Sequence, residues 1–175
     1  MRIISGQFKG RPINPPKNLP VRPTTDFAKE ALFNILANRV DMEELVVLDL
    51  FSGTGSIAYE FISRGCKSVI CADINYNCVA FINKMFAELK ADNAKAFKAN
   101  AFSFLKNHLG KYDLIFADPP FEMKGKEEII KTVFKNNNLE EGGCLIIEHP
   151  PTDNFSKEEH FLECRRYNKV NFSIF

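Results

Sequence analysis

Short apolar runs alternate with segments of helical periodicity from residue 46 to residue 148 of this 175-residue chain, and this rhythm restricts the fold more than any other feature. The predicted strands lie near 46–50, 68–72, 95–99, 112–117 and 143–148. The predicted helices lie near 56–64, 77–90, 101–109 and 125–135. Such alternation indicates βαβ units, which pair strands in parallel and place helices on both faces of the sheet. The sequence therefore predicts an α/β fold, and its length fits one domain over 1–175, since domains commonly span roughly 100–200 residues.

The two ends of the chain depart from this rhythm. Residues 1–23 hold five of the nine prolines, which predicts a short strand at 2–4 and then an extended, turn-rich arm. Helical periodicity follows Thr24, Thr25 and Asp26, whose side chains can cap a helix. We therefore divide the domain into a basic arm with a first helix at 1–40 and an α/β core at 45–175. Apolar and polar residues alternate over 170–174, which predicts a half-buried antiparallel strand at the sheet edge.

Positive charge is concentrated at the N-terminus. The whole chain carries 23 lysines and arginines against 22 aspartates and glutamates, yet residues 1–25 contain five basic residues and no acidic one. A basic arm of this kind can contact a polyanion, but a solvated basic tail has the same composition. The charge pattern alone leaves both interpretations open.

Cysteine and histidine patterns bear on compartment and on metal binding. The five cysteines are odd in number and include no C-x-x-C pair, which favours a reducing compartment and predicts a cytoplasmic protein. No apolar run approaches the roughly 20 residues that a membrane-spanning helix needs, so we expect no membrane contact. His108, His149 and His160 lack the spacing of metal ligands. We expect them at the surface or at helix ends, and we expect no bound metal.

Polar side chains occur at the end of every predicted parallel strand. They are Asp49, Asp73, Asn100, Asp118 and Glu148. Parallel α/β sheets bind ligands at the carboxyl ends of their strands, so a polar ligand spread across the sheet requires such a set. The alternative is that these residues only cap helices and form turns.

The first of these residues opens a glycine-containing turn, D-L-F-S-G-T-G-S at 49–56. Gly53 and Gly55 allow a ligand to approach the backbone closely, and the following helix offers free N–H groups. The spacing also fits a dinucleotide fingerprint, because Asp73 follows Gly53 by twenty residues. However, a carboxylate at Asp49 is unfavourable beside a pyrophosphate and suits a cationic ammonium group, as in S-adenosylmethionine. Asp73 then accepts the ribose hydroxyls, and Asn100 bonds the adenine edge.

The sharpest motif is D-P-P-F at 118–121, directly after a predicted buried strand. Two consecutive prolines fix the backbone and present carbonyl oxygens in set directions beside a carboxylate. Asp118 and the Pro119 carbonyl can hold the hydrogens of a planar nucleobase amine, and Phe121 can stack on the base. Positioned next to an activated methyl group, such an amine needs no metal and no covalent intermediate. The alternative is a turn stiffened by proline, with Phe121 in the core.

These motifs occur in one order with R-I-I-S-G at 2–6, K-G-R at 9–11, R-P-T-T-D at 22–26, S-R-G at 63–65 and N-A at 100–101. In this combination the sequence resembles the RsmD-type family of 16S ribosomal RNA guanine-N2 methyltransferases over nearly its whole length. The resemblance implies a Rossmann-like class I methyltransferase fold, with a mostly parallel seven-stranded sheet and an antiparallel hairpin at its C-terminal edge. It also implies S-adenosylmethionine as cofactor and a guanine of small-subunit ribosomal RNA as methyl acceptor.

The resemblance assigns roles to single residues of this chain, and we expect the protein to act as a monomer. The cofactor residues it implies are Asp49, Phe51, Gly53, Thr54, Gly55, Asp73, Asn100 and Ala101. The residues it implies at the target base are Asp118, Pro119, Pro120 and Phe121. We expect RNA contacts at Lys9, Arg11, Arg22, Thr24 and Thr25. Two positions depart from the family: Asp73 replaces a common Glu but should still reach the ribose, and Asn168 replaces a hairpin glycine but tolerates positive φ.

Other classes of protein share part of this pattern. A DNA amino-methyltransferase has the same cofactor site and D-P-P-[FY] element, but it usually needs a target-recognition segment that 175 residues scarcely accommodate. A protein-glutamine methyltransferase more often has Asn at position 118, and a nicotinamide-dependent oxidoreductase leaves 118–121 unexplained. The intact cofactor residues argue against a non-catalytic RNA-binding module. Such a module would fail to bind S-adenosylmethionine.

Overall fold

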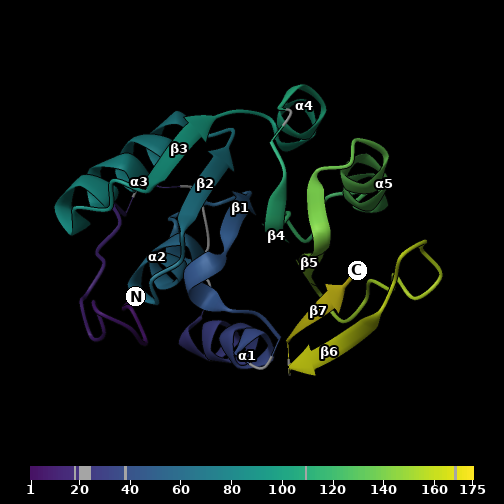
Figure 1. Ribbon diagram of the computed structural model, residues 1–175, viewed down its shortest axis with the longest axis horizontal. Helices are drawn as coiled ribbons and strands as arrows, with labels where there is room; N and C mark the ends of the chain where they lie inside the picture. Colours follow the sequence, from purple (N-terminus) through teal and green to yellow (C-terminus); the bar gives the residue numbers. More distant parts are fainter. Residues whose placement is uncertain (18, 20–24, 38, 109, 168) are drawn as a thin grey trace.

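The computed structural model describes residues 1–17, 19, 25–37, 39–108, 110–167 and 169–175. Within them lies a seven-stranded sheet in the order β3-β2-β1-β4-β5-β7-β6 (Figure 1). The first five strands in that order are parallel, and β7 is antiparallel to both of its neighbours. The strands are β1 (Val46–Leu50), β2 (Ser68–Asp73), β3 (Ala94–Lys98), β4 (Tyr112–Ala117), β5 (Leu139–His149), β6 (Glu163–Tyr167) and β7 (Val170–Ile174).

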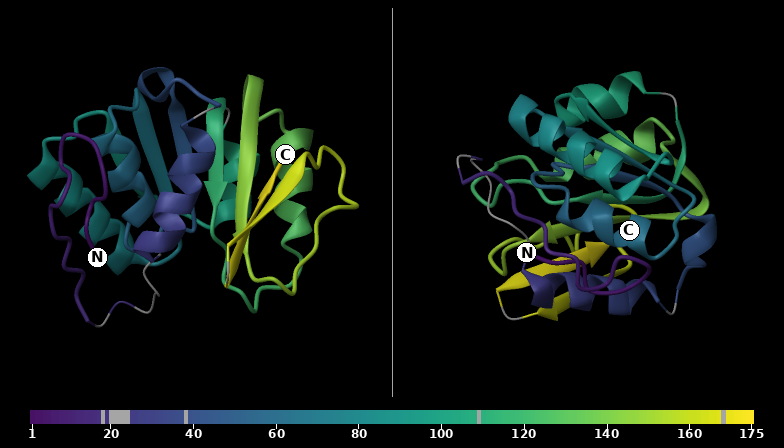
Figure 2. Two further views of the ribbon diagram at one scale, coloured as in Figure 1. Left: turned by 90° about the horizontal axis from the view of Figure 1, so that it is seen from below. Right: turned by 90° about the vertical axis from the view of Figure 1, so that its left-hand side faces the viewer.

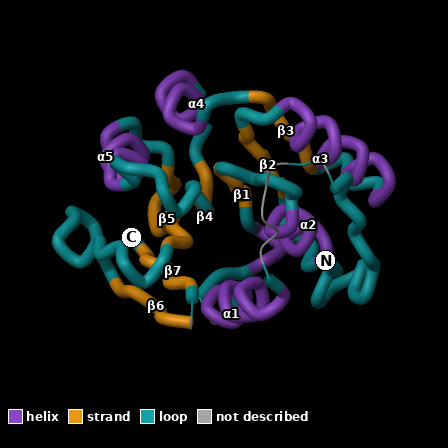
Figure 3. The backbone as a smooth tube through the Cα atoms, turned by 180° about the vertical axis from the view of Figure 1, so that it is seen from behind, coloured by secondary structure: helices purple, strands orange, loops and turns teal. Residues whose placement is uncertain are grey.

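Helices cover both faces of the sheet (Figure 3). They are α1 (Asp26–Leu36), α2 (Ser56–Ser63), α3 (Tyr76–Leu89), α4 (Ala101–Asn107) and α5 (Glu127–Lys135), with a short 3₁₀ turn η1 (Met42–Glu44) before β1. Helices α1, α2 and α3 pack in one core with Val47 and Phe116, whereas α4 and α5 pack in the other with Leu48 and Ile115. Successive strand residues point to opposite faces, so the central strands are apolar on both sides.

Capping residues that are visible in the sequence set the helix ends. Thr25 Oγ1 accepts the N–H of Ala28 at 3.2 Å and begins α1. Asn75 Oδ1 accepts the N–H groups of Asn77 and Cys78 and begins α3. The predicted boundaries of the four helices between strands are confirmed to within two residues.

The C-terminal part of the sheet differs from the prediction in the position and burial of β7, in the burial of His149 and in the start of β5. Strand β7 is not at the edge, because β6 lies outside it, and four of its five residues are buried rather than half. Its polar positions tolerate burial because Ser173 Oγ and His149 Nε2 are hydrogen-bonded at 2.8 Å. His149 is therefore buried, and the prediction of a surface or helix-end position for it was wrong. Strand β5 begins at Leu139 instead of residue 143, and its pairing with β4 shifts register between Tyr112 and Leu114.

The N-terminal arm packs against α2 and α3 (Figure 2). No strand forms at 2–4: Arg2 and Pro12 make only an isolated antiparallel bridge. The arm is held instead by Glu60 of α2, whose fully buried carboxylate accepts the N–H groups of Ile4 and Ser5 at 2.8 and 2.9 Å. Buried Lys29 of α1 donates to the Arg2 carbonyl from the other side.

In the part of the chain that the structure describes, no helix has the length and apolar character needed to cross a membrane.

Candidate active site

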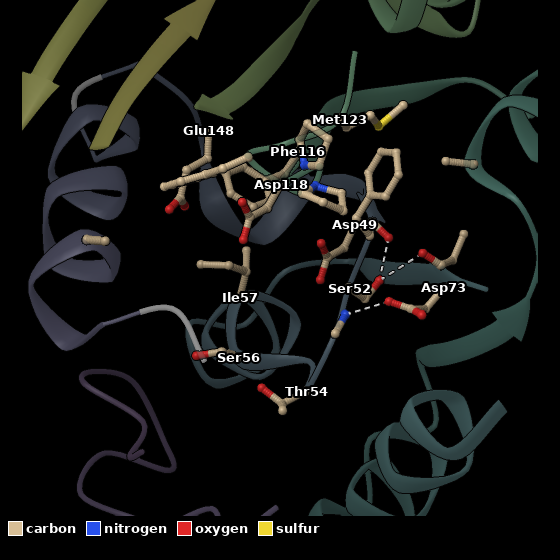
Figure 4. Close-up of a pocket in the computed structure, with 18 of the residues that line it drawn as sticks. Asp49, Ser52, Thr54, Ser56, Ile57, Asp73, Phe116, Asp118, Met123 and Glu148 are labelled. Carbon is tan, nitrogen blue, oxygen red and sulfur yellow. Dashed lines mark hydrogen bonds between the residues drawn. The ribbon is translucent and has the colours of Figure 1, made fainter. Parts of the chain in front are cut away.

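A cavity of about 990 Å³ opens at the carboxyl ends of the parallel strands (Figure 4). All five strand-end polar residues of the sequence analysis line it: Asp49, Asp73, Asn100, Asp118 and Glu148. Residues of α1 and of the β6–β7 hairpin close one side, among them Phe27 and Tyr167. The volume is at the upper end of the roughly 300–1,000 Å³ of small-molecule sites, which leaves room for a nucleotide-sized ligand and a second ring.

Four carboxyl groups from neighbouring strands point to the same face of the sheet. Asp73, Asp49, Asp118 and Glu148 belong to or follow β2, β1, β4 and β5, which are adjacent in that order. Ala117 of β4 pairs with Ile147 of β5, so the next residues, Asp118 and Glu148, lie opposite each other. Adjacent strands are about 4.8 Å apart, so this register places the two carboxyl groups side by side.

Burial and mutual repulsion disfavour the ionised forms of these carboxyls. Burial raises the pKa of Asp49 well above its ordinary value, and the charges of Asp118 and Asp73 raise it further. Burial raises the pKa of Asp118 to about 7, although the cation of Lys126 acts in the opposite direction. Burial, together with the Asp118 charge, raises the pKa of Glu148 to about 9. A cationic group in the cavity relieves this repulsion, whereas a pyrophosphate adds to it. The electrostatics therefore oppose the dinucleotide interpretation.

The glycine-containing turn connects β1 to α2 in a conformation that L side chains rarely adopt. Gly53 and Gly55 have φ values of +53° and +76°, and Phe51 has φ of +59°. The Gly53 N–H donates to Asp73 Oδ2 at 2.8 Å, and Ser52 Oγ donates to the Asp49 carbonyl at 2.6 Å. These bonds fix the turn against the ends of β1 and β2. A positive φ at a bulky residue such as Phe51 stores backbone strain, which is common at ligand sites.

Asn100 both lines the cavity and caps a helix. Its Oδ1 accepts the N–H groups of Phe102 and Ser103 at 3.1 and 3.2 Å, at the start of α4. Asn100 therefore caps a helix, as the alternative interpretation of the strand-end residues expected. The Nδ2 group makes no hydrogen bond among the described residues, so it can still donate to a ligand. Ala101 follows it as a buried residue of the cavity wall.

The loop at 118–126 leaves two acceptors unused. The Pro120 carbonyl accepts the N–H of Met123 at 2.9 Å, and the Phe121 carbonyl accepts Lys126 Nζ at 2.7 Å. Among the described residues, no hydrogen bond reaches the Pro119 carbonyl or the Asp118 carboxylate, and both residues line the cavity. Phe121 is 37% exposed at the mouth, so it is not a core residue. The loop is therefore rigid and presents two adjacent acceptors.

Lys126, which was not predicted from the sequence, fixes this loop. Its side chain is buried, and Nζ bonds both the Phe121 carbonyl and Asp153 Oδ2, the latter at 2.5 Å. A lysine beside a glycine in a polar segment gave no signal of burial. Phe27 and Tyr167 were also missed as cavity residues; their rings meet edge to face with centroids 6.3 Å apart.

The residues predicted to contact RNA are not all brought to the cavity. Thr25 lines it while capping α1. Lys9 is exposed on the hairpin-like arm, next to Phe8, whose N–H donates to Ser63 Oγ at the far end of α2. Arg11 Nη2 donates to the Glu88 carbonyl near the end of α3. Lys9 and Arg11 thus lie near the C-terminal ends of α2 and α3, and neither residue lines the cavity. The remaining two predictions, Arg22 and Thr24, fall outside the described residues.

Comparisons with known proteins identify the family of this chain. A family model described as Conserved hypothetical protein 95 matches residues 1–175. Ribosomal RNA small subunit methyltransferase D of Buchnera aphidicola subsp. Baizongia pistaciae is 32% identical, with 100% of this chain and 91% of the relative covered. The chain belongs to this methyltransferase family. The Escherichia coli protein of the same name is 34% identical, with 85% of this chain and 74% of the relative covered.

A solved structure supports the same family and fold. The candidate methyltransferase yhhF from Escherichia coli superposes with a TM-score of 0.86 at 30% identity, with 99% of this chain and 96% of the other covered. The sheet order, the antiparallel β7 and the helices on both faces confirm the Rossmann-like class I methyltransferase fold. The family resemblance is therefore confirmed, whereas the roles of single residues remain predictions.

Proposed function

We propose that this protein transfers a methyl group from S-adenosylmethionine to the exocyclic N2 amine of a guanine in 16S ribosomal RNA. One observation carries the proposal: a single cavity contains both the acid-rich glycine turn and the two unused acceptors of Asp118 and Pro119. The relatives named ribosomal RNA small subunit methyltransferase D support the reaction and the RNA.

The cavity fits S-adenosylmethionine at its β1–β2 side. Asp49 Oδ2 is buried without a hydrogen-bond partner among the described residues, as expected of an acceptor for the ammonium group. We assign the ribose hydroxyls to Asp73, whose oxygens each accept one backbone N–H and keep a further lone pair. The adenine edge is assigned to the Nδ2 group of Asn100. Phe51, Gly53, Thr54 and Ala101 line the rest of this side, whereas Gly55 shapes the turn without lining the cavity. When bound, the cofactor supplies a methyl group activated by a sulfonium centre.

The acceptor amine is held at the β4 side. Its lone pair is delocalised into the purine ring, so it is a weak nucleophile. Asp118 and the Pro119 carbonyl accept its two hydrogens and favour a pyramidal nitrogen that points at the methyl group. With the cofactor bound, its methyl group would pass to the amine nitrogen, its sulfur would remain as a neutral thioether, and the Asp118 carboxylate would take the proton that the amine loses. Pro120 fixes the loop, and Phe121 stacks on the base.

We extend the proposal to the RNA surface. Thr25 lines the cavity, and Lys9 and Arg11, near the C-terminal ends of α2 and α3, provide phosphate contacts for RNA that extends beyond the cavity. Arg22 and Thr24 are included from the sequence. A monomer in the cytoplasm is part of the same proposal; the five free cysteines support only the reducing compartment.

The proposal is tested with Asp118→Ala in single-turnover methyl transfer to 16S ribosomal RNA. Loss of the charged acceptor should lower the transfer rate at least about a hundredfold, while the affinity for S-adenosylmethionine stays unchanged. Exposed Asp92 is the matched control, and Asp92→Ala should behave as wild type. Full transfer by Asp118→Ala would rule out the amine-binding role. If wild-type protein binds no S-adenosylmethionine, it is an RNA-binding module and not an enzyme.

A further inference from the structure

Glu148 is a buried carboxyl in the cavity wall that neither the cofactor nor the acceptor amine uses. It lies in β5 and is only 5% exposed. Its Oε2 is buried and makes no hydrogen bond among the described residues. A buried carboxyl oxygen without a partner costs free energy, so its presence at a ligand cavity indicates a partner that arrives with the ligand.

The position of Glu148 relative to Asp118 limits what that partner can be. The pairing of β4 with β5 places these two residues opposite each other, on the same face of the sheet (Figure 4). On the other side of Glu148, the pairing of β5 with β7 places Phe172 as its apolar neighbour. The open direction is therefore toward the cavity, next to the group that Asp118 binds.

We propose that Glu148 accepts the N1–H of the target guanine while Asp118 holds its N2 amine. This inference rests on the proposed function. N1–H and N2–H are adjacent donors on one edge of guanine, and Asp118 and Glu148 are adjacent acceptors on one edge of the sheet. Two such bonds fix the rotation of the base in its plane, which one amine contact cannot do. Glu148 is thereby a binding residue that orients the amine.

The protonation of the pair agrees with this arrangement. Burial raises the pKa of both carboxyls, and the Asp118 charge raises the pKa of Glu148 further, so the pair favours a state in which Asp118 is ionised and Glu148 is neutral. A neutral carboxyl keeps an oxygen that accepts N1–H and gains an O–H that can donate to guanine O6. It also avoids a second negative charge beside Asp118.

The test compares an RNA fragment containing the target guanine with the same fragment containing N1-methylguanine at that position. The target is the guanine that wild-type protein methylates in 16S ribosomal RNA, located by mass mapping. For each protein variant, the single-turnover rate on the guanine fragment is divided by the rate on the N1-methylguanine fragment. The N1-methyl group removes the donor and collides with Glu148, so wild type should favour guanine at least about tenfold.

Variants at Glu148 test the proposed contact with guanine N1–H. Glu148→Ala removes the acceptor and opens space, so its preference for guanine over N1-methylguanine should fall to about threefold or less. Glu148→Val should give the same result, and its branched side chain is suited to a strand. Glu148→Gln keeps an acceptor oxygen and should retain the wild-type ratio. Exposed Glu141 on the same strand is the control, and Glu141→Ala should match wild type.

Each ratio is measured within one variant, so partial loss of folded protein cancels. An unchanged ratio in Glu148→Ala or Glu148→Val would overturn the N1 contact even if both variants are slow. If wild type fails to methylate the unmodified RNA at guanine N2, the proposed function fails instead, and the two failures are distinguishable.

Discussion

Replacing Gly55 by alanine should destabilise the turn on the cofactor side of the cavity. Two separate effects should lower the free energy of unfolding. The position has φ of +76°, which costs an L residue about 1–2 kcal/mol. A Cβ there would also lie 2.8 Å from the ring of Tyr59 and 2.9 Å from Ile82 Cγ1, and overpacking of this kind costs about 1–3 kcal/mol. We therefore expect Gly55→Ala to lower the free energy of unfolding by about 2–5 kcal/mol.

Gly142 provides the matched control, because its φ is +77° and a Cβ at this position would meet no described atom within 4 Å. Gly142→Ala should show only the backbone cost of about 1–2 kcal/mol in urea unfolding, with unchanged calorimetric affinity for S-adenosylmethionine. Gly55→Ala should also weaken that affinity at least about tenfold, since the turn must move. Equal unfolding free energies for the two variants, with equal affinities, would refute the close packing of this turn.

Three further predictions concern the acceptor loop and the basic arm. Lys126→Met should lower the free energy of unfolding by about 1.5–3 kcal/mol, because the Phe121 carbonyl and the loop lose a charged donor; urea unfolding measures this. The single-turnover rate should rise with pH through about 7 as Asp118 ionises, and in Lys126→Met this rise should move to higher pH because the lysine cation lowers the pKa of Asp118. A pH profile identical in both proteins would contradict that coupling. Replacing Lys9 and Arg11 by Gln should flatten the slope of log K against log salt for RNA binding by about 0.7–0.9 per lost phosphate contact, whereas an unchanged slope would mean that the arm is a solvated tail.

The sequence predicted the central fold well because four of the five parallel strands are short apolar runs, each bounded by a capping or turn residue. Strand β3 is mostly exposed, and only its place in the alternation predicted it. Thr25 and Asn75 begin helices by local hydrogen bonds, which involve only neighbours in the chain. The errors arise where a distant contact decides the structure. The burial of His149 depends on Ser173, which lies 24 residues away and makes both polar positions compatible with the core. The arm forms no strand because Glu60, more than fifty residues away, binds its backbone.

In the candidate site, too, residues in a local pattern were predicted, whereas residues placed by distant contacts were not. Asp49, Asp73 and Asp118 could be selected in the sequence because carboxyl ends of parallel strands meet at one edge. Lys126 could not be identified, because its burial depends on the path of the loop back to Asp153. The distance of Lys9 from the cavity was equally hidden, since it depends on how the arm packs along α2.

The most direct test of the central claim is the identity of the product. Wild-type protein, S-adenosylmethionine and unmethylated 16S ribosomal RNA are incubated together, and the RNA is digested to nucleosides for mass spectrometry. The account predicts N2-methylguanosine at one position, absent when Asp118→Ala replaces wild type. Methylation of adenine, of another guanine atom or of protein instead of RNA would contradict the account.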